Sequence, residues 1–175
     1  MSITIEAIEA SSDEELFKLL GQELQNRISA KRGSHEFVSE IQTLPCGLRA
    51  MAATYDLDVS LALDDLGWHF ANWHHKGYSE ETSRGLRELG AVDVAQIFDA
   101  AYRIVLPHWE PIASMLAVDF KVFQEWYSES ELEEALRPLN SRLWDICAAA
   151  GSHRLVKYWL GYARKYPERV VRERA

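Results

Sequence analysis

The sequence predicts an all-α fold for three reasons: its apolar residues recur at helical spacing, capping signals precede several of these runs, and no segment alternates apolar and polar residues long enough to form a strand. The chain has 175 residues, of which 47% are hydrophobic and 26% are charged. This length and composition are typical of one globular domain. We therefore expect a single-domain bundle of about eight to nine helices over 1–175, with frayed ends at 1–10 and 168–175.

A capping box opens the first predicted helix, since Ser12 is followed three residues later by Glu15. The helix is expected over about 13–31 and should end before Gly33. Its apolar face consists of Phe17, Leu20, Leu24 and Ile28. Ser34 is then expected to cap a second, short helix.

Pro45 fits the first turn of a third helix, which we expect to reach about Tyr55. The apolar residues that follow share one face of a helix over about 58–75, which Gly77 should end. These residues are Val59, Leu63, Leu66, Phe70 and Trp73.

The clearest helical periodicity lies in the middle of the chain. Ser79 is expected to cap a helix of 80–89 that ends at Gly90. A further helix follows and should close at Pro107. Its apolar positions are Val94, Ile97, Phe98, Ala101 and Val105.

The last third of the chain is less regular, particularly over 108–127. Ser128 and Glu131 form a second capping box, which predicts a helix that Pro138 should disturb and that should restart two to three residues later. Ser152 is expected to cap the last helix, whose shared face holds Val156, Trp159, Leu160 and Ala163. Across the whole chain the predicted core includes Leu63, Phe70, Trp73, Ile97, Phe98, Leu143, Trp159 and Leu160.

The chain shows no sign of secretion or membrane insertion. Its first residues, Met1–Glu9, hold two acids and no long apolar core, so they do not form a secretory signal. No run of about 18 apolar residues is present. Cys46 and Cys147 are too few for a disulfide framework or a structural zinc site. We expect a cytoplasmic protein.

The charge balance is acidic, with 27 Asp and Glu against 19 Lys and Arg and a net charge of −8. This balance argues against direct binding of nucleic acid or of an anionic membrane over a broad surface, and it favours a basic protein partner. The charge is uneven, because 119–134 holds six acids and one lysine, whereas 152–175 holds seven bases and two acids.

Two acidic runs are the candidate partner-binding residues. They are Asp13, Glu14, Glu15, Glu129, Glu131, Glu133 and Glu134, with Trp126 as an aromatic anchor beside the second run. The alternative is that these carboxylates only stabilise the N-termini of the helices that they open, where the helix dipole is positive.

Few residues suggest catalysis. The chain has no Walker-type loop, no Gly-x-Ser-x-Gly elbow and no His-Glu-x-x-His helix. Asp65 and His69 stand four residues apart, with His74 five residues further on, so these three are the best candidates for a metal site. The competing interpretation is an ordinary Asp–His surface pair. We expect no bound metal, no cofactor and no catalytic residue.

Several short motifs, in order along about 120 residues, resemble a bacterial all-helical family whose best-known type is a DNA mimic. The first are Leu44-Pro45, Arg49, Leu57-Asp58, Gly67-Trp68, Trp73, Leu86-Arg87-Glu88-Leu89-Gly90-Ala91 and Val94-Ala95. The later ones are Leu139-Asn140, Leu143-Trp144, Tyr162 and Tyr166-Pro167-Glu168. At Gly67-Trp68, where the family has Asn-Gly-Gly-Phe, this chain keeps one glycine and lacks the Asn.

The resemblance implies an acidic helical protein that presents carboxylates where DNA would present phosphates. Carboxylates on adjacent helical turns, about 5.4 Å apart along the axis, approach the spacing of backbone phosphates. Our first hypothesis is thus a non-enzymatic acidic interaction protein, a DNA mimic that binds and regulates a nucleic-acid-binding protein. Two alternatives stay open: a metal-dependent enzyme centred on Asp65, His69 and His74, and an immunity-type protein that neutralises a basic toxin. A homodimer is also left open.

Overall fold

The computed structural model describes residues 3–148 and 154–171, and these residues form helices and connecting turns with no β-strand. The all-α prediction is confirmed, although the described helices outnumber the eight or nine expected. They are α1 (Ile5–Ala10), α2 (Asp13–Arg27), α3 (His35–Gln42), α4 (Cys46–Leu63), α5 (Leu66–Asn72), α6 (Lys76–Glu88), α7 (Val92–Val105), the 3-10 turn η1 (Leu106–His108), α8 (Trp109–Val118), α9 (Phe120–Tyr127), α10 (Glu131–Cys147), α11 (Val156–Lys165) and α12 (Glu168–Val171).

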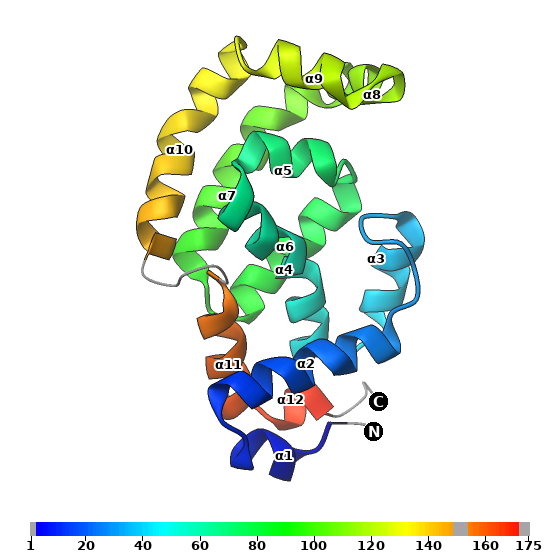
Figure 1. The fold of residues 1–175 in the computed structure, drawn as a ribbon, viewed down its shortest axis with the longest axis vertical. Helices are drawn as coiled ribbons and strands as arrows, with labels where there is room; N and C mark the ends of the chain where they lie inside the picture. Colours follow the sequence, from blue (N-terminus) through cyan, green and yellow to red (C-terminus); the bar gives the residue numbers. More distant parts are fainter. Residues whose placement is uncertain (1–2, 149–153, 172–175) are drawn as a thin grey trace.

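Helices α4 and α6 cross at the centre of the molecule (Figure 1). Their backbones approach closely because Gly85 has no side chain, since a Cβ there would lie 2.9 Å from the carbonyl oxygen of Ala50. The Thr82 hydroxyl strengthens the contact by donating a 2.8 Å hydrogen bond to the carbonyl oxygen of Ala53. Gly85 therefore sets how near the two central helices can lie.

Two buried apolar clusters pack around this central pair, one in the upper and one in the lower half of Figure 1. The upper cluster joins α5, α7, α8, α9 and α10, and includes Phe70, Ile97, Phe98, Phe123 and Leu143. The lower cluster joins α1, α2, α3, α11 and α12, and includes Leu20, Phe37, Met51 and Trp159. Helices α4 and α6 contribute to both clusters, so burial of apolar surface ties each half to the central pair.

Helices are present near both ends of the chain. Helix α1 begins at a Thr4 cap, and Ile8 within it is fully buried. The backbone N–H of Ile3 donates a 3.1 Å hydrogen bond to the buried carboxylate of Glu23. At the other end, α12 buries Val170. Residues 5–10 and 168–171, which lie in the two stretches expected to be frayed, are helical.

The first long helix ends earlier than the predicted range of 13–31. Its capping box at Ser12 is confirmed, but α2 stops before Ile28, whose backbone is extended. The cause is Glu40, whose carboxylate accepts 2.9 Å hydrogen bonds from the N–H groups of Ser29 and Ala30 and so directs the chain toward α3. Helix α3 begins at Ser34, as predicted.

The predicted helix over 58–75 is wrong, because the chain breaks between α4 and α5. Asp64 is extended, and the Asp65 carboxylate caps α5 by accepting a 3.0 Å hydrogen bond from the N–H of Trp68. Leu63 was predicted to be a core residue but is 74% exposed. A local carboxylate cap has outweighed a continuous apolar repeat.

Helix α6 also begins at a different residue from the one predicted. Its N-cap is His75, whose Nδ1 accepts a 3.1 Å hydrogen bond from the N–H of Tyr78, so Gly77 and Ser79 both lie inside the helix. Gly90 ends the segment with a positive φ of 77°, as its predicted role requires. The next helix, α7, follows its predicted periodicity.

The irregular stretch 108–127 forms η1, α8 and α9. The cap of α10 is Ser130 and not Ser128, since the Ser130 hydroxyl accepts a 3.1 Å hydrogen bond from the N–H of Glu133. Helix α10 then runs through Pro138 without the expected break. Ser152 lies outside the described residues, while α11 contains the predicted apolar face.

The remaining predicted core residues differ in how deeply they are buried. Phe70, Ile97, Phe98, Leu143 and Trp159 are buried as expected. Trp73 and Leu160 are half-buried and pack against the lower cluster.

Candidate protein-binding surface

The three residues of the metal hypothesis do not form a common site. Asp65 and His69 both belong to the start of α5, but the Asp65 carboxylate accepts from the N–H of Trp68, whereas the His69 ring contacts the Ser60 hydroxyl. Across 3–148 and 154–171, no three His, Cys, Asp or Glu side chains are grouped so that they could hold a metal ion. Each of the three residues has a structural role instead.

His69 is a core residue with 1% of its surface exposed. Its Nδ1 lies 2.9 Å from the Ser60 hydroxyl, which donates a 2.8 Å hydrogen bond to the carbonyl oxygen of Asp56. Burial lowers the pKa of His69 to about 3. The imidazole is therefore neutral at physiological pH and serves to connect α5 with α4.

His74 lies on a different part of the molecule. Its Nδ1 is 3.2 Å from the carbonyl oxygen of Phe70, and its ring stacks on Trp109 with centroids 4.0 Å apart. Burial lowers the pKa of His74 below its ordinary value. The side chain thus packs between α5 and α8.

The acids at the start of α2 all have local partners. Asp13 accepts a 2.7 Å hydrogen bond from Arg164 on α11, Glu14 pairs with Lys18 at 2.6 Å, and Glu15 completes the capping box. Helix stabilisation accounts for the contacts of Glu14 and Glu15, and the contact of Asp13 ties α2 to α11.

The acids near the start of α10 are less neutralised. Glu133 pairs with Arg137 at 2.5 Å, but Glu129, Glu131 and Glu134 form no ion pair within the described part of the chain. Trp126, the expected anchor, is half-buried and packs near Phe123 and His108. It contributes at most a partly exposed ring to this surface.

The two acidic runs lie in different parts of the molecule. The start of α10 lies at the top of the molecule in Figure 1, whereas α1 and the start of α2 lie in its lower part. A single partner surface of ordinary size is therefore expected to meet one run and not both.

The fold adds a second pair of carboxylates to the α10 run. The Tyr127 hydroxyl donates to Asp65 at 3.1 Å, which joins the end of α9 to the turn between α4 and α5. Burial raises the pKa of Asp65, and the nearby negative charge of Glu133 raises it further, against the hydrogen bonds that the carboxylate accepts. Asp64 is exposed beside Asp65.

We call these six residues the acidic corner: Asp64, Asp65, Glu129, Glu131, Glu133 and Glu134. Sequence reasoning did not assign Asp64 and Asp65 to this surface, because they lie more than sixty residues from the α10 run in the chain. The available signal was the Asp64-Asp65 pair itself, which is a good helix cap and argues for a turn. The exposed Leu63 adjoins this pair and offers an apolar contact at the edge of the acidic corner.

A comparison with protein families identifies the relatives of this chain. The model of the family described as DMP19-like protein matches residues 42–165, well over half of the sequence. The chain belongs to the DMP19-like family. Neither the curated proteins nor the solved structures include a match to it.

The DMP19-like region separates the two acidic runs. It spans α4 to α11 and includes the whole acidic corner, whereas Asp13, Glu14 and Glu15 precede it. Gly67, which carried part of the sequence resemblance, is packed against Tyr127 beneath the acidic corner. The part of the chain that defines the DMP19-like family therefore builds the acidic corner.

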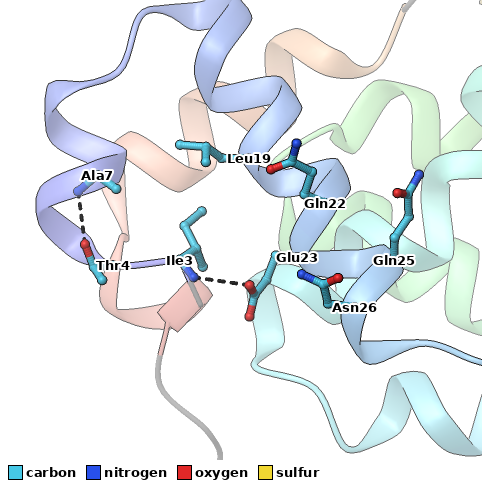
Figure 2. A pocket seen from close by; sticks show the side chains of 8 residues that line it. All are labelled: Ile3, Thr4, Ala7, Leu19, Gln22, Glu23, Gln25 and Asn26. Carbon is cyan, nitrogen blue, oxygen red and sulfur yellow. Dashed lines mark hydrogen bonds between the residues drawn. The ribbon is translucent and has the colours of Figure 1, made fainter. Parts of the chain in front are cut away.

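A pocket outside the DMP19-like region lies between α1 and α2 (Figure 2). Its volume is about 490 Å³, and its lining combines Ile3 and Leu19 with the amides of Gln22, Gln25 and Asn26. Its single carboxylate, Glu23, is already held by the N–H of Ile3 and by Arg27. The lining shows no grouping that indicates a reaction.

All helices within the described ranges are too short or too polar to cross a bilayer.

Proposed function

We propose that this DMP19-like protein binds the basic, nucleic-acid-binding surface of another protein through the acidic corner. The observation that carries the proposal is that the family-defining region holds six carboxylates in two segments, the α4–α5 turn and the start of α10, and that among them only Glu133 forms an ion pair within the described residues. Uncompensated carboxylates are available to a cationic partner, and long-range attraction accelerates the encounter.

The geometry suits imitation of a phosphate backbone. Glu131 and Glu134 are three residues apart on α10 and so lie on neighbouring positions of one helix surface. Asp64 and Asp65 extend the negative charge onto a second segment. A rigid helix start and a capped turn hold these groups in place, which reduces the entropy that binding would otherwise cost.

The proposed role is non-enzymatic, since shape and charge alone support binding, and it requires no cofactor. It applies equally to a monomer and to a homodimer. A net charge of −8 opposes the binding of duplex nucleic acid itself, so the expected partner is a basic protein that binds DNA.

The test is a competition experiment with a partner captured from the host lysate. The protein should displace duplex DNA from that partner. Reversing Glu131, Glu133 and Glu134 to Lys should weaken the displacement at least about tenfold, and added salt should weaken displacement by the unmodified protein. Circular dichroism should show that the triple variant stays folded.

The matched control reverses Asp13, Glu14 and Glu15 to Lys, which changes the net charge by the same amount at the other end of the molecule. This variant should lose its capping box, at a cost of about 1 kcal/mol in stability, and keep its affinity for the partner. Equal losses of affinity in both triple variants would show that net charge and not the acidic corner drives binding. If the displacement of DNA does not change with salt concentration, binding does not depend on charge and the proposed mechanism is contradicted.

A further inference from the structure

A small groove lies between the end of α6 and one face of α11, with a volume of about 280 Å³. Two stripes of α11 line it at four-residue spacing. One stripe is aromatic, with Tyr158, Tyr162 and Tyr166, and the other holds Lys157, Gly161 and Lys165. We call this the tyrosine–lysine groove. It lies in the basic C-terminal segment, which the acidic corner leaves unexplained.

The groove keeps two positive charges without an acidic partner. Lys157 and Lys165 are exposed, and neither forms an ion pair within the described ranges. Their ammonium groups lie 5.1 Å and 5.0 Å from the ring centroids of Tyr158 and Tyr166. Cation–π contacts of this kind hold a charge in place without cancelling it.

The one acid in the lining is already occupied. Glu88, at the end of α6, accepts a hydrogen bond from the Tyr162 hydroxyl and pairs with Arg169 at 3.1 Å. Arg169 therefore offsets the charge of Glu88. The groove as a whole stays positive, in contrast to the acidic corner.

The aromatic stripe gives the groove an apolar side, in which the rings of Tyr162 and Tyr166 are tilted by 56° to each other and the Arg169 guanidinium lies 5.8 Å and 5.7 Å from their centroids. Tyr158 and Tyr166 are half-buried, so each ring is supported by the protein and partly open. Gly161 keeps the space between the two lysines clear, because a Cβ there would have no atom within 4 Å. A planar group could lie in this space while a phosphate reaches a lysine.

We infer that the tyrosine–lysine groove binds a nucleoside phosphate, with the base against the tyrosines and the phosphate at Lys157 or Lys165. Stacking of bases on aromatic rings together with basic contacts to phosphates holds the nucleotides of single strands, and it tolerates different bases. The groove is small, so it suits one nucleotide, either free or at the end of a strand. This site is separate from the acidic corner, since α11 lies in the lower half of Figure 1 and α10 begins at the top.

The probe is fluorescently labelled adenosine triphosphate, followed by anisotropy at low salt. The double variant Lys157→Glu/Lys165→Glu should lose affinity about tenfold or more, because each lysine is expected to supply a charge-assisted contact. The control variant Lys31→Glu/Lys121→Glu makes the same charge change at two exposed lysines outside the groove and should keep full affinity. Equal affinity in both double variants, or no binding by the unmodified protein, would overturn the inference.

A second pair of variants tests the space itself. Gly161→Trp should fill the groove and abolish binding, whereas Gly21→Trp, at an equally open helical glycine on α2, should not. Circular dichroism should confirm that both are folded. Binding that survives Gly161→Trp would contradict the proposed position of the base.

Competitors distinguish the sources of the ligand. Inorganic triphosphate should compete much less well than adenosine triphosphate, and equal competition would show that the base is not recognised, which overturns the inference. If an oligothymidylate with a 5′-phosphate competes better than free nucleotide, the ligand is a strand end. If free nucleotide competes better, the ligand is a free nucleotide. The acidic-corner triple variant should bind nucleotide normally, so the two proposals can fail independently.

Discussion

A side chain at Gly67 would overlap with the ring of Tyr127. Its Cβ would lie 2.5 Å from Cε2 of that ring and closer still to Cζ and the hydroxyl oxygen. Tyr127 cannot easily move away, because it is 2% exposed, stacks on Phe123 at 5.3 Å and donates its hydroxyl proton to Asp65. Gly67 is therefore required for the contact between α5 and α9 that brings Asp65 to the acidic corner.

We expect Gly67→Ala to lower the free energy of unfolding by about 1–3 kcal/mol, the usual cost of inserting a methyl group into a packed core. Chemical denaturation measures this change. The matched control is Gly21→Ala, where a Cβ meets no atom within 4 Å and the higher helix propensity of Ala should stabilise the protein by up to about 1 kcal/mol.

A double-mutant cycle tests the cause. In a Tyr127→Ala background the methyl group of Gly67→Ala has room, so its cost should fall by about 1 kcal/mol or more. A cost that is the same with and without Tyr127 would show that the overlap is not the source of the destabilisation.

The break between α4 and α5 leads to a contrast between two apolar residues that the sequence placed together in the core. Phe98 is fully buried, with the ring centroid of Phe70 5.1 Å away, so Phe98→Ala should cost about 3–5 kcal/mol. Leu63 is 74% exposed, and Leu63→Ala should change stability by less than about 0.5 kcal/mol. A large loss at Leu63 would argue for a continuous helix through this turn.

These two residues illustrate what the sequence could predict about the fold. Periodicity placed Phe98 correctly because the apolar repeat of α7 runs without a competing signal. Periodicity placed Leu63 in the core wrongly, because apolar residues on the two sides of a turn can by chance recur at helical spacing. The turn is stabilised by the Asp65 cap, with its contacts to Trp68 and Tyr127, and by the hydrogen bond from the N–H of Leu66 to Asn140, which the local sequence does not reveal.

The candidate surface was predictable in part for a similar reason. A run of acids such as Glu131, Glu133 and Glu134 is visible in the sequence, and the fold places all three in the first turn of α10. The addition of Asp64 and Asp65 was not predictable, because it depends on how α5 packs against α9 and α10. The tyrosine–lysine groove likewise needs the end of α6 beside α11.

The buried His69 should make stability depend on pH. Its pKa in the folded protein is about 3, against an ordinary value of 6.5, so the unfolded chain binds a proton that the folded protein does not. The contribution of the neutral His69 to the free energy of unfolding is fully present above pH 6.5 and is lost as the pH falls toward 3. Within this range the free energy of unfolding should fall by up to about 1.4 kcal/mol per pH unit.

Comparison with His69→Gln isolates this contribution. The free energy of unfolding of the unmodified protein, minus that of the variant, should fall steadily between pH 6 and pH 4 in urea titrations. Ser60→Ala is the control: it removes the hydroxyl partner of His69 but leaves the imidazole buried, so the slope should persist. A difference that does not vary with pH would mean that the folded protein takes up the proton as readily as the unfolded chain.

Pro138 offers a way to stabilise the protein near the acidic corner. It lies inside α10, where it cannot donate the N–H that would normally bond to the carbonyl oxygen of Glu134, and it is exposed. Pro138→Ala restores that donor and relieves the clash of the ring with the preceding turn. We expect a gain of about 1–2 kcal/mol, after allowing for the greater freedom of the unfolded chain without proline.

The alternative is that the proline sets the path of α10. Asn140, two residues further on, accepts a 3.1 Å hydrogen bond from the N–H of Leu66 and so anchors α10 to α5. If this contact needs the proline, Pro138→Ala should destabilise the protein and also weaken partner binding by displacing the first turn of α10. The control is Ser141→Ala, an exposed change in the same helix that restores no hydrogen bond. It should raise the free energy of unfolding by at most about 0.5 kcal/mol, the effect of helix propensity alone. A larger change in Pro138→Ala, in either direction, is then due to the proline itself.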